Sequence, residues 1–257
     1  MSRNFELLTE AGRMRELLEL HVEPPKVTVP MPMPMPSIVE DAFSANPSLE
    51  MTAATRDEMS KLVQKLFLGA QAPRRVVFAG TESGCGCSWT CARVAEGLAG
   101  QGRGSVCVVD CNLRSPGLHQ QFASENHHGQ SDALLGSGPI REYAHRWSRN
   151  LWLLSCGGSA ESSAAMLGSD RMRSRLAELR SAFDYVLIDA APLNLCNDAI
   201  ILGGASDGVV LLLKANSSRR EIARKAVQDL QSANVRVLGA VLNQRTFPIP
   251  EALYKKL

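Results

Sequence analysis

Lysine is missing from the whole central part of this sequence, because none occurs between Lys65 and Lys214. Tyrosine is also scarce, with three in 257 residues, and aromatic residues together make up 5%. No apolar run reaches the roughly 18 residues that a membrane-spanning helix needs, so we expect no direct membrane span. The N-terminal segment has neither the long apolar core nor the cleavage signature of a signal peptide, and none is expected.

Positively charged residues exceed negatively charged ones only slightly, with 28 Lys and Arg against 26 Asp and Glu. A formal net charge of +2 gives no argument for an anionic membrane, and no nucleic-acid partner is expected. Seven cysteines form an odd set without a repeated disulfide-like spacing, so reduced thiols and a cytoplasmic location are the expectation. The hydrophobic share of 45% and the charged share of 21% are those of an ordinary soluble globular protein.

The chain divides into three parts by composition. Residues 1–23 place apolar residues at helical spacing, which predicts an amphipathic helix that docks on its own domain or on a partner. Residues 24–50 contain "VPMPMPMPS" and predict an extended Pro/Met-rich linker, because each proline fixes φ and removes a backbone donor. Residues 51–257 are expected to form one domain.

Strand-like and helix-like segments alternate along this domain. Its apolar, β-branched runs predict six strands, at 74–80, 104–110, 150–156, 183–190, 208–215 and 235–243. Helical periodicity is found at 56–68, 88–101, 170–182 and 218–233. Continuous apolar strands that alternate with amphipathic helices predict an α/β fold with a doubly wound, mostly parallel sheet flanked by helices.

A glycine-rich turn follows the first predicted strand. In a doubly wound sheet, ligands bind beyond the carboxyl ends of the strands, and this turn opens a helix there. Its glycines let backbone amides face an anion without a Cβ in the way. We therefore expect ATP or ADP to be bound by the loop residues Ser83, Gly84, Cys85, Gly86, Cys87, Ser88 and Trp89. A plain strand-to-helix turn is the alternative, since the lysine of the phosphate-loop pattern is here Cys87.

Acidic residues end two further predicted strands. Asp110 closes the second strand, with Asn112 close behind, and Asp189 closes the fourth. An acid at this edge suits Mg²⁺, so Ser88 and Asp189 are the expected metal ligands. A single Asp there is often a turn former, but a glycine-rich loop and two acids in one sheet favour a phosphate site.

With these motifs, residues 56–245 resemble the cytoplasmic bacterial tyrosine kinases of capsule and exopolysaccharide synthesis, within the MinD- and ParA-like phosphate-loop ATPases. The similar stretches read "VCVVDCNLRSPGLHQQF", "SDALLG", "NLWLLSCGG", "LGSDRMRSRLAELRSAFDYVLIDAAPL" and "VRVLGAVLN". The resemblance implies that Asp110, Asn112 and Asp189 are the catalytic positions and that Asn243 reads the adenine. It also implies ATP or ADP with Mg²⁺ as the ligand.

The sequence departs from the family pattern at several places. Cys87 replaces the lysine, and Asn112 stands where the family has an acid. The helix that mediates ring assembly in the family keeps Glu58 and Lys61 but continues with Gln64. The tyrosine-rich tail is reduced to Tyr254. A neutral thiol cannot replace a cation that follows charge into the transition state, and such a loss typically costs ~10²–10³ in rate.

The function that the resemblance implies is a catalytically impaired regulatory partner in exopolysaccharide or capsule biosynthesis. Its expected partner is the cytoplasmic segment of a membrane polysaccharide co-polymerase, which would place it at the inner face of the membrane, and a homo-oligomer is a further expectation. An active tyrosine autokinase and a MinD- or ParA-like positioning ATPase are the alternatives. The clustered Cys85, Cys87 and Cys91 leave three interpretations open: small packing residues, a redox-sensitive loop, or a metal site.

Overall fold

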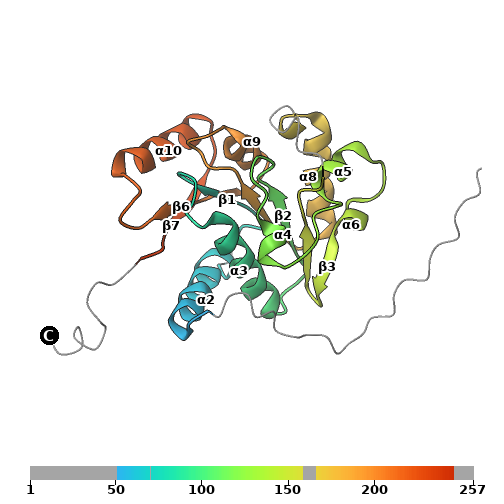
Figure 1. The fold of residues 1–257 in the computed structure, drawn as a ribbon, viewed down its shortest axis with the longest axis horizontal. Helices are drawn as coiled ribbons and strands as arrows, with labels where there is room; N and C mark the ends of the chain where they lie inside the picture. The colour runs from blue at the N-terminus through green and yellow to red at the C-terminus, as the bar shows by residue number, and fades with distance from the viewer. Residues whose placement is uncertain (1–50, 70, 159–165, 246–257) are drawn as a thin grey trace, which may run out of the picture. The chain divides into compact units, whose positions relative to one another are not determined.

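A seven-stranded sheet forms the centre of the structure, in the order β3-β4-β2-β5-β1-β6-β7 (Figure 1). The described strands are parallel to their neighbours except β3, which is antiparallel to β4. Their bounds are β1 Arg75–Gly80, β2 Val106–Cys111, β3 His145–Ser148, β4 Leu151–Leu154, β5 Tyr185–Ala190, β6 Gly208–Lys214 and β7 Val237–Asn243. The doubly wound, mostly parallel sheet predicted from the sequence is confirmed.

The computed structural model describes residues 51–69, 71–158 and 166–245, which all belong to one unit that spans Asn46–Leu257. The predicted N-terminal helix (1–23), the predicted linker (24–50) and Tyr254 lie outside the described residues and stay predictions. No helix in the described part of the chain combines the length and the apolar character that a membrane span requires.

Helices flank the sheet and follow the strands along the chain. They are α2 Ala53–Phe67, α3 Cys87–Gly100, α4 Leu118–Gln121, α5 Gln130–Leu135, α6 Ile140–Tyr143, α8 Asp170–Ala182, α9 Asp198–Gly204 and α10 Arg220–Ser232. Two of the longer helices begin at side-chain caps: Thr52 accepts from the amide of Thr55 at 3.2 Å, and Ser169 accepts from the amide of Met172 at 3.1 Å. These caps fix where α2 and α8 start.

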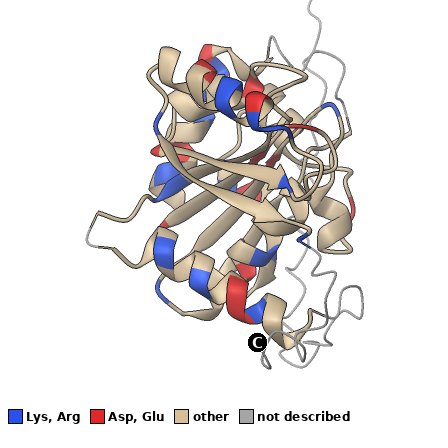
Figure 2. Cartoon of the chain, turned by 90° about the vertical axis from the view of Figure 1, so that its left-hand side faces the viewer, with Lys and Arg blue, Asp and Glu red and all other residues tan. Residues whose placement is uncertain are grey.

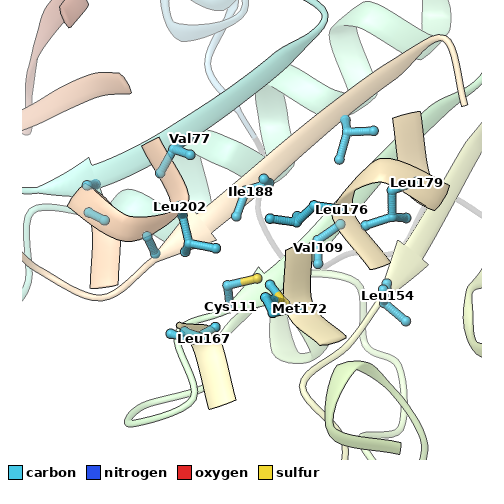
Figure 3. Close-up of a cluster of buried hydrophobic side chains, with 14 of the residues drawn as sticks. Val77, Val109, Cys111, Leu154, Leu167, Met172, Leu176, Leu179, Ile188 and Leu202 are labelled. Atoms are coloured by element: carbon cyan, nitrogen blue, oxygen red, sulfur yellow. The ribbon is translucent and has the colours of Figure 1, made fainter. Parts of the chain in front are cut away.

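Alternate residues of each strand enter cores on opposite faces of the sheet. Val77 of β1 and Val109 of β2 belong to one core, while Val76 and Val108 belong to the other. The first core is covered by α8, α9 and α10, and Figure 3 shows it around the labelled side chains of Ile188 and Met172. The second is covered by α2 and α3. Side chains of a strand alternate between the two faces of the sheet, so a strand buried on both faces contributes to both cores.

The structure contains elements that sequence patterns did not predict. The edge strand β3 reads "HRWS" and is largely exposed, so it has no apolar run by which to recognise it. The short helices α4, α5, α6 and α9 have at most seven residues, too few for a helical period to stand out. The expected strands and long helices are all present, within a few residues of their predicted bounds.

Candidate nucleotide-binding site

The loop between β1 and α3 has the backbone shape of an anion cradle. Gly84 and Gly86 adopt left-handed conformations, with φ of 78° and 76°. Gly86 is also the N-cap of α3, which begins at Cys87, one residue before the predicted start. A residue with a Cβ pays a steric cost in this region, so glycine is required for the loop to turn into the helix here.

The amide groups of the loop have no acceptor in the described part of the chain. Within the described residues, no amide N–H of residues 82–86 donates a hydrogen bond, and the first amides of α3 have no intrahelical partner. The carbonyls of Gly84 and Cys85 accept from Gln244 Nε2 at 3.0 Å and from Asn243 Nδ2 at 2.9 Å. Because C=O and the following N–H of a trans peptide point in opposite directions, these bonds turn the amides of Cys85 and Gly86 away from β7.

Asn243 at the end of β7 packs directly against the loop. A Cβ built on Gly86 would overlap the amide nitrogen of the Asn243 side chain. The structure therefore gives Asn243 a part in holding the loop, whereas the adenine contact that the family resemblance implies for it stays a prediction. Gln244 holds the next carbonyl of the same loop, and only its place beside Asn243 could have indicated it.

A second anchor holds the other side of the loop. The Ser218 hydroxyl donates to Glu82 Oε1 at 2.6 Å and accepts from the backbone amide of Lys214 at 2.9 Å. The amide of Thr81 donates to the carbonyl of Leu212 at 3.0 Å. The loop is thus fixed to β6 and to the segment before α10, as a cradle needs to be if it binds an anion without reorganising.

Asp189 ends β5 beneath this loop and is fully buried. Neither of its carboxylate oxygens has a hydrogen-bond partner of normal geometry within the described residues. Burial raises the pKa of Asp189, the nearby Asp110 raises it further, and the Ser88 hydroxyl and Cys87 thiol partly offset the rise. Burying an ionised carboxyl group without hydrogen-bond partners costs free energy, so this environment favours protonation of Asp189 or binding of a cation to it.

Asp110 stands at the same level on the neighbouring strand, in register with Asp189. Its oxygens accept from three backbone amides, those of Asn112 at 3.1 Å and of Gly117 and Leu118 at 3.0 Å each. Burial raises its pKa, and these amides act in the opposite direction. Asp110 therefore organises the segment after β2, whereas Asp189 keeps its oxygens free.

Cys87 is the first residue of α3 and is half-buried. Burial raises the pKa of its thiol well above the usual range, and the neighbouring Asp189 carboxyl raises it further. The pKa values of Cys91 and Cys111 move in the same direction for the same leading reason. These thiols are held protonated, which is the opposite of the lowered pKa that a redox-reactive cysteine requires.

No lysine or arginine among residues 51–69, 71–158 and 166–245 forms an ion pair with Asp110 or Asp189. An arginine of the segment after β2, Arg114, approaches Asp198 at 3.6 Å instead. Asp198 is buried at the start of α9, and no motif in the sequence had indicated this pair. The floor of the candidate site is therefore acidic, and no lysine or arginine of the described residues pairs with these two aspartates.

The remaining predicted residues lie around the same loop. Ser83 is exposed, and Cys85 is buried in the core, so Cys85 can offer only its backbone to a ligand. Trp89 is half-buried in the first turn of α3. Asn112 accepts from the amide of Ser115 at 3.3 Å, which is a turn contact. The Ser88 hydroxyl faces Asp189 and packs against Gly117, whose hypothetical Cβ would lie 3.1 Å from it.

These residues fit a magnesium nucleotide except at one position. The free amides and left-handed glycines fit the phosphates, and Asp189 with Ser88 fits Mg²⁺, which takes few protein ligands when phosphates supply the rest. When bound, such an ion neutralises the charge of phosphates during their transfer. The described residues contain no group of three or more His, Cys, Asp or Glu side chains that could hold a metal by itself. Cys87 is the mismatch, because a lysine cation is expected there.

Comparison with solved structures shows that other proteins share this fold. A ParA family ATPase from Chlorobium tepidum superimposes with a TM-score of 0.58 at 15% identity, covering 67% of this chain and 75% of that one. The chimerical protein CapA2B2 gives a TM-score of 0.70 at 20% identity, over 76% of this chain and 87% of that chain. At such identities the likeness concerns the fold alone.

Comparison of sequences defines the family. Tyrosine-protein kinase YwqD of Bacillus subtilis is 32% identical over 161 residues, 62% of this chain and 68% of YwqD. Putative tyrosine-protein kinase EpsB of Ralstonia solanacearum is 31% identical over 169 residues, 65% of this chain but 22% of EpsB. No protein-family model matches the chain. The chain belongs to the bacterial tyrosine-protein kinases, and it spans about two thirds of YwqD and under a quarter of EpsB.

Proposed function

We propose that this protein is a kinase-like regulatory partner in exopolysaccharide or capsule biosynthesis, with impaired phosphoryl transfer. It binds the cytoplasmic segment of a membrane polysaccharide co-polymerase and so works at the inner face of the membrane. Its part there is to regulate chain length or assembly. Family membership and the state of the phosphate loop support this proposal.

The observation that carries the proposal is the chemistry at Cys87. The residue occupies the lysine position at the start of α3, and its protonated thiol faces Asp189. The positive charge of a lysine there would offset the negative charges of the two buried aspartates and of the phosphates. A neutral thiol offsets none of these charges. Loss of one preorganised electrostatic partner costs about 10²–10³ in rate, so we expect weak or absent kinase activity.

The rest of the site supports retained nucleotide binding. The cradle is anchored on both sides by side chains, and its amides are free. Amide contacts and Mg²⁺ can bind phosphates without the lysine, at a loss of about 1.5–3 kcal/mol for one charge-assisted contact. ATP or ADP with Mg²⁺ is therefore the proposed ligand, as a regulator of the partner contact.

The test measures phosphorylation and partner binding on the same preparations. The full chain and Cys87→Lys are incubated with radiolabelled ATP and Mg²⁺, and each is then mixed with the cytoplasmic segment of a membrane polysaccharide co-polymerase. The proposal expects binding to that segment by both proteins, with tyrosine phosphorylation increased in Cys87→Lys.

Two results would contradict the proposal in different ways. Phosphotyrosine at Tyr254 in the natural chain, at a rate matching Cys87→Lys, would make it an active autokinase. ATP-dependent dimerisation without any binding to the co-polymerase segment would favour the ParA-like positioning ATPase instead.

A further inference from the structure

Among the described residues, the strand β7 forms an unpaired edge of the sheet. β7 pairs with β6 on one side, and no described strand lies on its other side. It is seven residues long, contains no charged residue, and has half-buried or exposed side chains throughout. Leu242 is 57% exposed. An uncharged edge of this length is a template for pairing with another strand.

The opposite edge of the same sheet is protected. β3 has four residues, includes His145 and Arg146, and its pairing with β4 is irregular between Arg146 and Ser148. Short length, charge and irregularity are the devices that prevent edge pairing. The two edges of the sheet therefore differ, because β3 carries features that prevent pairing and β7 does not.

The free backbone groups of β7 can be assigned to residues. The carbonyl of Asn243 accepts from the amide of Ala215 at 2.9 Å, so the backbone groups of Asn243 face β6. Because the two backbone groups of a strand residue share one side and alternate along the strand, those of Leu242 and Ala240 face outward. These residues are also the exposed ones of the strand. The open edge therefore offers donors and acceptors at Ala240 and Leu242.

Cations border this edge. Figure 2 shows it as an uncharged strand with α10 above it and α2 below it, and both helices carry Lys and Arg. On and beside α10, five exposed cations outnumber the exposed carboxylates Glu221 and Asp229. None of the five forms an ion pair within the described residues. The five are Arg219, Arg220, Arg224, Lys225 and Arg236.

We propose that β7 is the docking edge for an extended, acidic segment of a partner protein, which adds to the sheet as a further strand. Backbone hydrogen bonds to Ala240 and Leu242 bind such a segment, and its carboxylates face the cations of α10. This surface lies on β7 and α10, and the inference does not depend on the proposed role in polysaccharide export.

Charge distinguishes this occupant from the other candidates. In a two-fold dimer through β7, the basic α10 of one copy would face the α10 of the other, and like charges oppose that contact. An anionic membrane would satisfy the cations but would leave the outward backbone groups of β7 without partners. An acidic strand provides carboxylates for the cations and hydrogen-bond partners for the outward backbone groups of β7.

The test uses the full chain and a synthetic peptide of about eight residues that alternates glutamate with valine. A matched peptide has lysine in place of glutamate. Fluorescence anisotropy measures binding of each labelled peptide to the natural chain, to Ala240→Pro and to Ala240→Val. Proline removes the outward amide without removing a bond to β6, whereas valine keeps that amide.

The proposal expects the acidic peptide to bind the natural chain and Ala240→Val alike, and Ala240→Pro about tenfold more weakly or worse. A second variant, Arg224→Glu with Lys225→Glu, should weaken binding to a similar extent, whereas Arg103→Glu, an exposed arginine beyond α3, should not. The double variant Arg224→Glu with Lys225→Glu serves as the test if Ala240→Pro does not fold.

Three kinds of result would overturn the proposal. One is equal binding of the acidic peptide to the natural chain and to both the proline and the charge-reversed variants. Another is no binding of the acidic peptide, or binding of the lysine peptide at equal strength. The third is binding of the natural chain to phosphatidylglycerol vesicles, lost in the charge-reversed variant, without peptide binding, which would make the surface a membrane contact.

Discussion

Asp110 on β2 and Asp189 on β5 occupy the same register position on neighbouring strands, and both are fully buried. Asp110 is bonded to three backbone amides, while neither oxygen of Asp189 has a hydrogen-bond partner within the described residues. Each carboxyl group is affected by burial, which raises its pKa, and Asp110 raises that of Asp189 further. These two buried carboxyl groups therefore favour binding of a proton, or of a cation that arrives with a ligand.

The first prediction concerns stability and pH. The pKa of Asp189 in the folded protein, about 7, lies above its value of 3.8 in an unfolded chain. The folded state therefore holds the proton more tightly, and the associated stability is lost as pH rises between these two values. We expect Asp189→Asn to stabilise the protein by about 1–3 kcal/mol near pH 8 without Mg²⁺, and to have little effect near pH 4.

Urea unfolding across this pH range checks the prediction. Asp170→Asn is the control, because it makes the same change at a side chain that is 97% exposed. A free energy of unfolding for Asp189→Asn that follows the natural protein at every pH would show that Asp189 does not carry this penalty.

The second prediction concerns the two left-handed glycines of the loop. Gly84→Ala and Gly86→Ala both pay about 1 kcal/mol for a Cβ at positive φ. A Cβ at Gly84 meets nothing within 4 Å, whereas one at Gly86 overlaps the Asn243 amide. We expect Gly86→Ala to destabilise the protein by about 1–3 kcal/mol more than Gly84→Ala, as measured by thermal unfolding.

Asn243→Ala provides the control for this pair. It removes the overlap, so the excess cost of Gly86→Ala should largely disappear in the double variant. If the two alanine variants cost the same in the natural background, the contact between Gly86 and Asn243 does not constrain the loop.

The third prediction concerns a buried arginine far from the loop. Arg175 on α8 donates to the carbonyls of Ala133, Gly136 and Gly138 and pairs with Glu178 at 2.6 Å. Its removal leaves the buried carbonyl of Ala133 without the Arg175 hydrogen bond and Glu178 without its ion pair, so Arg175→Ala should cost about 3–5 kcal/mol of stability. Arg173→Ala removes an exposed arginine of the same helix and should cost less than about 1 kcal/mol. Similar losses in chemical unfolding of both variants would refute this role.

The sequence was sufficient for six of the seven described strands and for the expectation that the candidate site lies at their carboxyl ends. Buried parallel strands appear as continuous apolar runs, and polar residues at their carboxyl ends mark the ligand edge, so β1, β2 and β5 with their loops were predictable. β3 was not predictable, because a short exposed edge strand of mixed residues has no periodic signal.

Contacts within the site were beyond sequence reasoning for a different reason. Ser218 holds Glu82 across 136 residues of chain, and Asn243 holds Cys85 across 158. Such pairs depend on strand order, which places β6 next to β1 and β7 next to β6, and not on any local pattern. The direction of the thiol pKa values also required the structure, because a helix N-terminus lowers a cysteine pKa whereas burial beside Asp189 raises that of Cys87.

The measurement that tests the central claim most directly is calorimetric titration of Mg-ATP into the natural chain, Cys87→Lys and Cys87→Met. The methionine variant matches lysine in length without its charge. If the cradle is intact and lacks only a cation, Cys87→Lys will bind Mg-ATP about tenfold or more tightly than the natural chain, and Cys87→Met will not. Equal affinity of the natural chain and Cys87→Lys would contradict the account, because the missing charge would then not be what limits this site.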